Sequence, residues 1–398
     1  MSDAEENAVL ALQGMRVLDL TTLLPGSLCT QILADLGAEV LKIEKPNGGD
    51  NFRSTPPVIK TMGSFFHILN RNKKGVALNF KHEEGREIFL KLVPRADVIV
   101  ESCAPGTMEE IGLGYDDVKH INPHIIYCSL TGFGQDGPYR EKPAHDIDFL
   151  SISGILDLLK ERECRPMVPA VQLAGAGGSI TAAMGILSAL LRRVRTGEGQ
   201  YLDVALLDCL TPFLSLVMSQ YMADRTIPRQ GVSRVGGDYA CYNVYETADG
   251  NYLSLGCLEE KFWAEFCKAV GKEELIQEQY VSSPRREEII EEVRSIFRQK
   301  TREEWIDYLD RYSICVSPVN SLKDVLRDPQ ITKRGLWFSS IHPDEGETPQ
   351  QAFPIKFSED QPTVRHHAPR LGEHTREVLR DLCYHDDEIK DLVDKGIV

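Results

Sequence analysis

The chain has 398 residues, of which 42% are hydrophobic and 26% are charged. This composition is typical of a globular protein and excludes a disordered or collagen-like chain, and the length predicts two or three domains. The formal net charge is −15. Nucleic acids and anionic membranes both need a basic surface, so we expect neither as a partner.

One stretch reverses the acidic balance. Between Lys42 and Lys81 the sequence carries eight basic residues and only two acidic ones, Glu44 and Asp50. Such a stretch suits a small polyanionic ligand, although a run of this kind can equally be a solvated face that acids elsewhere balance. The basic residues are Lys42, Lys45, Arg53, Lys60, Arg71, Lys73, Lys74 and Lys81.

The first part of the chain alternates short strands with helices. Apolar spacing predicts strands over 16–20, 38–43, 76–80, 97–101 and 125–129. Helices are expected over 27–36, 83–92 and 115–121, with a helical turn around Met108. This alternation predicts an α/β fold with a doubly wound, mostly parallel sheet.

The second part changes in texture. Helices are expected over 178–194 and 206–222, separated by a strand over 201–204. A hairpin over 242–255 and helices over 259–270, 286–299 and 303–312 then predict a smaller α+β domain. Residues 330–369 are predicted to be irregular, before helices over 374–382 and 386–395. We expect a large domain of residues 1–225 and 330–398, and a small domain of residues 226–329.

The cysteines and the N-terminal sequence point to the cytoplasm. The ten cysteines include no C-x-x-C pair and no zinc-ligand spacing, and the acidic N-terminal residues do not resemble a secretory signal. The uncharged stretch 171–191 is long enough to span a bilayer, but its glycines and alanines favour a buried helix.

Several catalytic motifs are absent. The sequence has no G-x-S-x-G, no Walker A motif and no H-E-x-x-H, and no G-x-G-x-x-G follows the first strand. His366 and His367 lack a third ligand at matching spacing, so we expect no metal site. A pyrophosphate near the first turn would have to be held by basic side chains, because that turn contains a single glycine, Gly26.

Eight motif segments follow one another along nearly the whole chain, at 16–20, 35–46, 70–81, 96–106, 129–138, 145–148, 195–200 and 369–375. Together they resemble the family III CoA-transferases and the related α-methylacyl-CoA racemases. The resemblance implies an interlocked dimer, a CoA thioester as substrate and a carboxylic acid as its partner substrate.

The resemblance also implies which residues contact CoA. The phosphates would lie against the basic stretch, with Leu23, Ser102 and Cys103 along the cofactor path and the Gly236-Gly237 turn completing a shared site. A family position that is often Arg, shortly after Gly106, is Glu110 here. The matching positions in the basic stretch are Lys45, Arg71, Leu78 and Lys81.

The resemblance further implies a nucleophile that the chain lacks. Family III transferases attack the thioester with an Asp carboxylate and pass through anhydride and enzyme-thioester intermediates. That Asp should fall near Ala174 or Gly175, and we expect Ala174 at its position, yet no Asp or Glu occurs between Glu163 and Glu198. A racemase needs the same Asp on the side of the α-carbon opposite His145. The resemblance implies that Glu259 supports His145.

Three functions remain open. In the first, the chain is one subunit of a heteromeric CoA-transferase for an acid such as benzylsuccinate, as in toluene degradation, and a paralogous subunit supplies the Asp. In the second, the chain alone is an acyl-CoA isomerase or racemase that uses His145 and Asp146 as acid and base. In the third, it binds CoA without catalysing a reaction.

Overall fold

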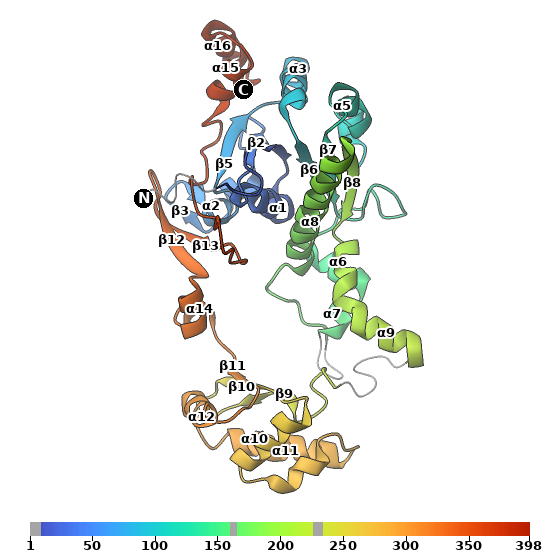
Figure 1. Cartoon of the computed structure of the whole chain (residues 1–398), viewed down its shortest axis with the longest axis vertical. Helices are drawn as coiled ribbons and strands as arrows, with labels where there is room; N and C mark the ends of the chain where they lie inside the picture. The colour runs from blue at the N-terminus through green and yellow to red at the C-terminus, as the bar shows by residue number, and fades with distance from the viewer. Residues whose placement is uncertain (1–8, 160–164, 226–233) are drawn as a thin grey trace. The chain divides into compact units, whose positions relative to one another are not determined.

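The computed structural model describes residues 9–159, 165–225 and 234–398. The chain divides into two compact units (Figure 1). Unit 1 contains residues 1–156, 168–213 and 330–398, and unit 2 contains residues 157–167 and 214–329. The helix at 215–224, which we expected in the large domain, thus belongs to unit 2.

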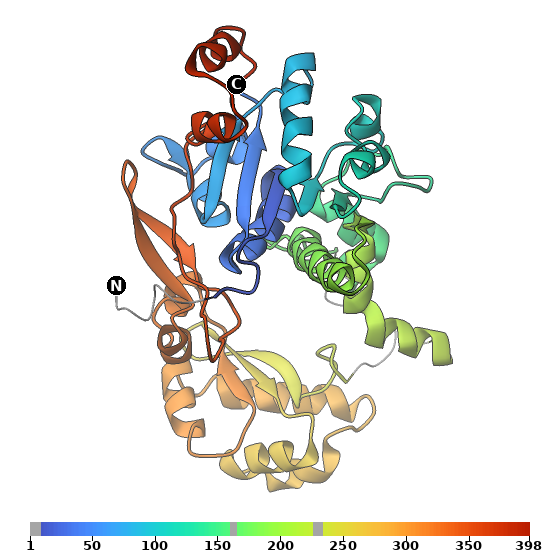
Figure 2. The same ribbon diagram turned by 45° about the horizontal axis from the view of Figure 1, so that its top comes forward.

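Unit 1 is built on a six-stranded sheet in the order β5-β2-β1-β6-β7-β8. Every neighbouring pair of strands is parallel, and Figure 2 shows strands of this sheet between covering helices. The doubly wound parallel sheet is therefore confirmed. Its strands are β1 (Arg16–Leu20), β2 (Glu39–Glu44), β5 (Lys73–Ala77), β6 (Val98–Glu101), β7 (Ile126–Thr131) and β8 (Gln200–Ala205).

Alternate residues of the central strands β1, β2, β6 and β7 enter two separate cores. In β1, Leu18 and Leu20 belong to one apolar cluster and Val17 to the other. Side chains of successive strand residues point to opposite faces, so a sheet covered on both sides needs apolar residues throughout. One face is covered by α3 (Glu83–Leu92), α5 (Tyr115–Ile121), α15 (Thr375–Asp381) and α16 (Asp386–Asp394), and the other by α1 (Leu23–Asp35) and α8 (Leu173–Thr196).

Shorter elements complete unit 1. They include α2 (Ser64–Leu69), α4 (Thr107–Glu110), α6 (Asp146–Ser153), the strands β3 (Val58–Ile59) and β4 (Met62–Gly63), and α14 (Pro329–Arg334). The helix α7 (Ile155–Leu158) lies at the boundary between the units. Residues 330–369 are not irregular as expected, because β12 (Trp337–His342) and β13 (Gly346–Gln351) pair as an antiparallel hairpin.

Unit 2 has the expected α+β composition. The antiparallel sheet β11-β10-β9 consists of β9 (Tyr242–Glu246), β10 (Tyr252–Gly256) and β11 (Val316–Pro318). Its core is aromatic, with Trp263, Phe266 and Phe297 stacked in sequence. The helices are α9 (Ser215–Asp224), α10 (Glu260–Ala269), α11 (Arg285–Phe297), α12 (Arg302–Leu309) and α13 (Leu322–Val325).

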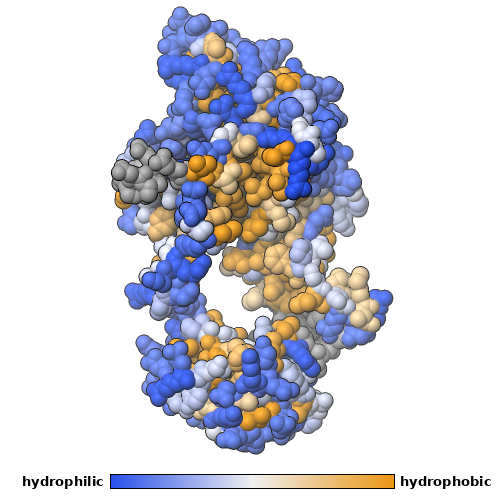
Figure 3. All heavy atoms as spheres, viewed as in Figure 1, coloured by the Kyte–Doolittle hydropathy of each residue, from blue (hydrophilic) through white to orange (hydrophobic). Residues whose placement is uncertain are grey.

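The helix α8 contains the long uncharged stretch. By length and composition it could cross a membrane, but 56% of its most apolar window is buried inside the structure. It packs against α1 and against β7 and β8. Its outer face nevertheless exposes Ile180, Met184, Leu191 and Val194, and Figure 3 shows apolar side chains gathered over this part of unit 1.

Candidate functional site

A cavity of about 730 Å³ opens in unit 1 at the carboxyl ends of β1, β6 and β7. Its walls include Thr22–Pro25 after β1, Ser102–Pro105 after β6 and Gly132 after β7. The chain leaves β1 and β6 in opposite directions across the sheet, since β1 is followed by β2 on one side and β6 by β7 on the other. Doubly wound sheets bind ligands at such a switch point.

Two of the predicted catalytic residues line this cavity. His145 is the N-cap residue of α6, and Asp146 is the first residue of that helix. The backbone N–H of His145 donates to the Asp148 carboxylate at 2.9 Å. Asp146 instead reaches a second helix, because its Oδ1 accepts a hydrogen bond from the backbone N–H of Gly175 at 2.8 Å. The cavity thus lies where α6 and α8 begin.

The sequence placed the expected nucleophile at Ala174 or Gly175, both in the first turn of α8, and of these two positions Gly175 lines the cavity. Ala174 is completely buried and does not line the cavity. The N-cap residue Gln172 does line it. A Cβ atom added to Gly175 would lie 3.6 Å from Gln172 Oε1 and 3.7 Å from Asp146 Oδ1. The polar side chain at this helix start is therefore an amide, Gln172, close to the Asp146 carboxylate.

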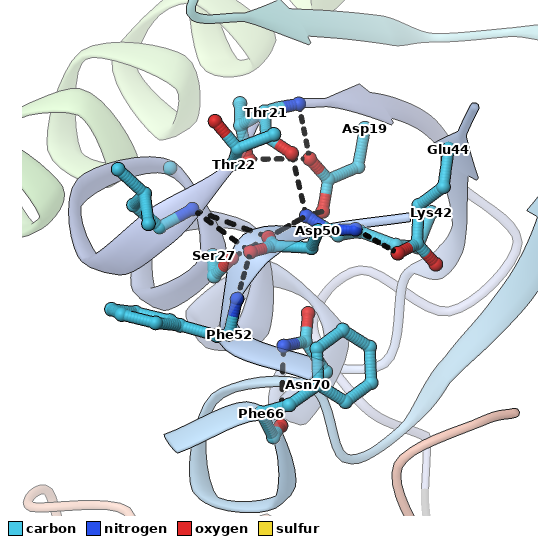
Figure 4. A network of polar contacts seen from close by, with 12 residues as sticks. Asp19, Thr21, Thr22, Ser27, Lys42, Glu44, Asp50, Phe52, Phe66 and Asn70 are labelled. Carbon is cyan, nitrogen blue, oxygen red and sulfur yellow. Dashed lines mark hydrogen bonds and ion pairs between the residues drawn. The ribbon is translucent and has the colours of Figure 1, made fainter. Parts of the chain in front are cut away.

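The wall after β1 is held by a buried charge network (Figure 4). Leu23 has φ of 61° and donates its backbone N–H to Asp50 at 3.2 Å. Lys42 Nζ lies 3.2 Å from Asp50 and donates to the Thr21 carbonyl oxygen at 2.6 Å. The left-handed conformation is unfavourable for Leu, so these contacts fix a strained turn directly against the cavity.

Charge pairing sets the protonation of this network. Burial by itself would lower the pKa of Lys42, but Asp19 and Asp50 raise it above its usual value. Burial would likewise raise the pKa of Asp19, yet Lys42 and Lys73 lower it. For Lys73 burial dominates and lowers the pKa to about 8. Lys42 and Asp19 therefore form a charged pair inside the protein.

Much of the basic stretch proves to be internal, which corrects its assignment to CoA. Arg71 is buried, and its guanidinium is paired with Asp35 at 2.6 Å. Arg53 is paired with Glu44 at 2.6 Å. Leu78 is 1% exposed and belongs to the apolar core. Arg71 thus cannot face a ligand, because its charge and hydrogen bonds are used inside the fold.

Three lysines of the stretch remain at the surface. Lys45, Lys60 and Lys81 are exposed and make no ion pair with any other described residue, although Lys60 donates to the Asp344 carbonyl oxygen at 2.7 Å. The charge of Lys81 acts on Cys103, whose pKa it lowers, although burial and Glu101 together raise that pKa to about 11. Lys81 therefore lies close to the cavity wall formed by Ser102 and Cys103.

Ser102 and Cys103, which the resemblance placed along the cofactor path, line the cavity. Ser102 Oγ accepts a hydrogen bond from the Thr22 backbone N–H at 3.2 Å and so joins the turns after β1 and β6. The raised pKa of Cys103 keeps its thiol protonated at neutral pH. Cys103 therefore contributes a neutral, weakly polar surface.

The remaining predicted site residues belong to unit 2. Glu259 is the N-cap residue of α10. Gly236 and Gly237 line a second cavity, of about 1110 Å³, on the sheet of unit 2. Gly237 has φ of 83°, a conformation that favours glycine.

Two cavity residues escaped the sequence analysis. Gln172 could have been found as the polar residue directly before the apolar helix, where an N-cap is expected. Arg140 lies in the loop between β7 and α6, and neither periodicity nor motif spacing distinguishes it. In the described ranges, no group of three or more His, Cys, Asp or Glu side chains could hold a metal ion.

Comparisons with known proteins show the family of the chain. The family model "CoA-transferase family III" matches residues 12–375. The chain is 33% identical to the succinyl-CoA:glutarate CoA-transferase of Mus musculus, covering 97% of this chain and 90% of the relative. It is 32% identical to the succinyl-CoA–L-malate CoA-transferase beta subunit of Chloroflexus aurantiacus, covering 98% of both chains.

The similarity also extends to a racemase and to a solved structure. The chain is 31% identical to the human α-methylacyl-CoA racemase, covering 98% of each chain. A CAIB/BAIF family protein from Brucella suis superposes with a TM-score of 0.83 at 31% identity, covering 94% of this chain and 99% of that structure. The resemblance seen in the sequence is confirmed, and the chain belongs to CoA-transferase family III.

Proposed function

We propose that this chain is one subunit of a heteromeric CoA-transferase that moves CoA between succinyl-CoA and a second dicarboxylic acid. The observation that carries the proposal is the polar residue at the start of α8. Gln172 lines the cavity there, and no Asp or Glu occurs between Glu163 and Glu198. An amide cannot act as the anionic nucleophile that family III transfer requires, so a paralogous subunit supplies it.

The reaction itself defines what the partner provides. A carboxylate oxygen of the partner subunit attacks the thioester carbonyl carbon, the C–S bond breaks and CoA leaves as a thiolate. CoA then attacks the resulting mixed anhydride and releases succinate, which leaves an enzyme thioester for the acceptor acid. The present chain binds CoA and shapes the cavity, and an interlocked pairing of the two subunits would bring both to one site.

The acceptor class follows from the names of the relatives. Glutarate and L-malate are both short dicarboxylic acids, and succinyl-CoA is the donor named in both cases. An aryl-substituted succinate such as benzylsuccinate belongs to the same class and remains our proposal for the acceptor. The Chloroflexus relative is named as a beta subunit, which supports a heteromeric assembly.

Reconstitution tests this proposal. Three samples are purified: this chain alone, the paralogue alone and the complex of the two. Each sample is incubated with succinyl-CoA and with glutarate, L-malate or benzylsuccinate. We expect new acyl-CoA only from the mixture, detected by chromatography and mass spectrometry. Full activity of the lone chain would overturn the heteromeric proposal, and a paralogue without a carboxylate at the start of its corresponding helix would contradict it.

A second function is favoured by a separate observation. His145 and Asp146 lie together on the cavity wall. An acid and a base that exchange the α-proton of an acyl-CoA must both reach the same bound substrate, and this placement allows it. In that case the lone chain would exchange the α-proton of an acyl-CoA in deuterated water, and His145→Ala would abolish the exchange. Binding of CoA with neither transfer nor exchange would instead indicate a non-catalytic homologue.

A further inference from the structure

We propose that Arg140 binds a phosphate group of CoA at the end of the cavity formed by residues 102–106. This inference rests on the proposed use of a CoA thioester. It assigns a phosphate contact to a loop between β7 and α6 that lies outside the basic stretch.

The Arg140 guanidinium lies close to a glycine of the segment that follows β6. Gly106 has φ of 89°, and a Cβ atom added to it would lie 3.1 Å from Arg140 Nη2. The guanidinium therefore lies against the backbone of the segment that follows β6, where any larger residue would crowd it. This contact places a cation from one loop beside Ser102 and Cys103, which lie on another.

Arg140 is also available to a ligand. It lines the cavity, its side chain is exposed, and no carboxylate of the described residues lies within ion-pair distance of it. Its backbone N–H donates to the Gly137 carbonyl oxygen at 3.3 Å. Guanidinium groups bind phosphate oxygens in pairs, with two parallel N–H donors.

The negative charges of CoA need more cations than the basic stretch leaves available. CoA carries about four negative charges, and each phosphate needs a nearby donor or cation. The structure uses Lys42, Arg53 and Arg71 internally, which leaves few cations of the basic stretch for a ligand. Lys45, Lys60 and Lys81 remain exposed, and of these Lys81 acts on the same segment as Arg140, through Cys103.

Nearby acids make the cation more necessary. The charges of Glu101 and Glu109 both act on Cys103 and would repel a phosphate. Glu101 is turned inward, since its carboxylate accepts from the Cys103 backbone N–H at 2.7 Å. Glu141, next to Arg140, lines the cavity as well. Arg140 and Lys81 together offset these acids at the end of the cavity where the segment 102–106 lies.

Calorimetric titration of the full chain with three probes tests the assignment. The probes are CoA, 3′-dephospho-CoA and pantetheine, which carries no phosphate. Arg140→Gln should weaken CoA binding about tenfold or more, as expected for a lost charge-assisted contact, and leave pantetheine binding unchanged. Arg140→Lys should retain part of the affinity, because it keeps the charge and loses the paired donors.

Matched variants on the same loop sharpen the result. Glu141→Gln removes a negative charge beside Arg140 and should strengthen CoA binding or leave it unchanged. Lys142, whose Nζ lies 5.0 Å from the centre of the Tyr139 ring, serves as a second cation in the same loop. Lys142→Gln should weaken CoA binding less than Arg140→Gln, since its charge already has an aromatic partner.

Two outcomes would contradict the assignment. Equal weakening of CoA and pantetheine by Arg140→Gln would show a structural role. Unchanged CoA binding with a raised KM for a dicarboxylic acid in the reconstituted enzyme would assign Arg140 to the acceptor instead. Failure of the proposed function is distinguishable, because Arg140-dependent CoA binding without any CoA transfer would leave this contact intact.

Discussion

Asp146 caps the helix α8 although it belongs to α6. Its Oδ1 accepts the backbone N–H of Gly175 at 2.8 Å, a bond that the side chain of an N-cap residue usually makes. The actual N-cap residue, Gln172, makes no such bond. The capping carboxylate thereby links the two helices that begin at the cavity, and it leaves the Gln172 side chain free to face the ligand.

The capping role of Asp146 can be separated from its charge. Asp146→Ala removes the acceptor and should lower the free energy of unfolding by about 1 kcal/mol. Asp146→Asn keeps an acceptor oxygen and should lose about half as much, since only the favourable charge at a helix N-terminus is lost. Urea denaturation measures both variants. Equal stability of Asp146→Ala and the wild type would show that the bond does not hold α8.

Under the proposed function, Gln172→Asp should give the lone chain a carboxylate nucleophile. The new carboxylate would stand at the cavity-lining start of α8, where it could attack a bound thioester. After incubation with succinyl-CoA, we expect a covalent CoA adduct on the peptide that contains residue 172, detected by mass spectrometry. The wild-type chain should form none.

Ala174→Asp is the matched control for that gain of function. Ala174 is 0% exposed, so a carboxylate there would be buried without a partner and should cost about 3 kcal/mol or more of stability. It should form no adduct. An adduct at position 174 and none at position 172 would support the alignment that the sequence suggested and contradict the geometry of the cavity.

The buried lysines should prove structural rather than ligand-binding. Lys42 is completely buried between Asp19 and Asp50. Lys42→Met leaves the buried Asp50 carboxylate without its ion-pair partner and Asp19 with Lys73 alone, and should destabilise the protein by about 3–5 kcal/mol. Lys74 pairs with Glu39 and Glu377 near the surface, and Lys74→Met should cost less than about 1 kcal/mol. Similar losses for both variants, measured by urea denaturation, would contradict this difference.

The sequence predicted the sheet well because the signal was local. Val17 and Leu18 enter opposite cores from neighbouring positions, and continuous apolar runs of this kind are read directly along the chain. The hairpin of β12 and β13 was missed for the converse reason. Trp337, Phe338 and Ile341 are all exposed, and the alternate buried residues of the second strand, Thr348 and Gln350, are polar. Neither strand therefore buries the alternating apolar face by which a strand is recognised in a sequence.

The binding residues were harder to predict because charge pairing is not local. Lys42 and Lys81 look alike in the sequence, yet one is buried beside Asp19 and the other is exposed. Arg71 pairs with Asp35, 36 positions earlier. Only the folded chain shows which cations are already neutralised, and it also brings Arg140 to Gly106 from a separate loop.

Cys103 should react slowly despite lining the cavity. Burial and Glu101 raise the pKa of its thiol to about 11, so only about 0.1% is thiolate at pH 8. Cys383 is exposed and serves as the internal control. Iodoacetamide at pH 8, followed by peptide mass spectrometry, should alkylate Cys383 well before Cys103. Equal rates at the two positions would contradict the raised pKa.

Acid should weaken the packing around His67. Its ring is buried, and the centroids of the His67 and His342 rings lie 5.1 Å apart. Glu345 and Arg53 lie near enough to act on its charge. Burial and His342 lower the pKa of His67 to about 4, from an ordinary value of 6.5. The unfolded chain therefore binds a proton at this position at a higher pH than the folded chain does. Stability is unaffected by His67 above pH 6.5, falls as the pH drops from 6.5 towards 4, and falls no further below that.

Comparison with a variant isolates this contribution from that of the carboxylates. Urea denaturation of the wild type and of His67→Gln is measured between pH 7.5 and pH 4.5. The variant should be less stable at pH 7.5, because the packing against His342 is lost, but its stability should decline less steeply below pH 6.5. His385→Gln, at an exposed helix N-cap, should follow the wild-type slope. Parallel curves for His67→Gln and the wild type would show that His67 binds protons equally in the folded and unfolded chains.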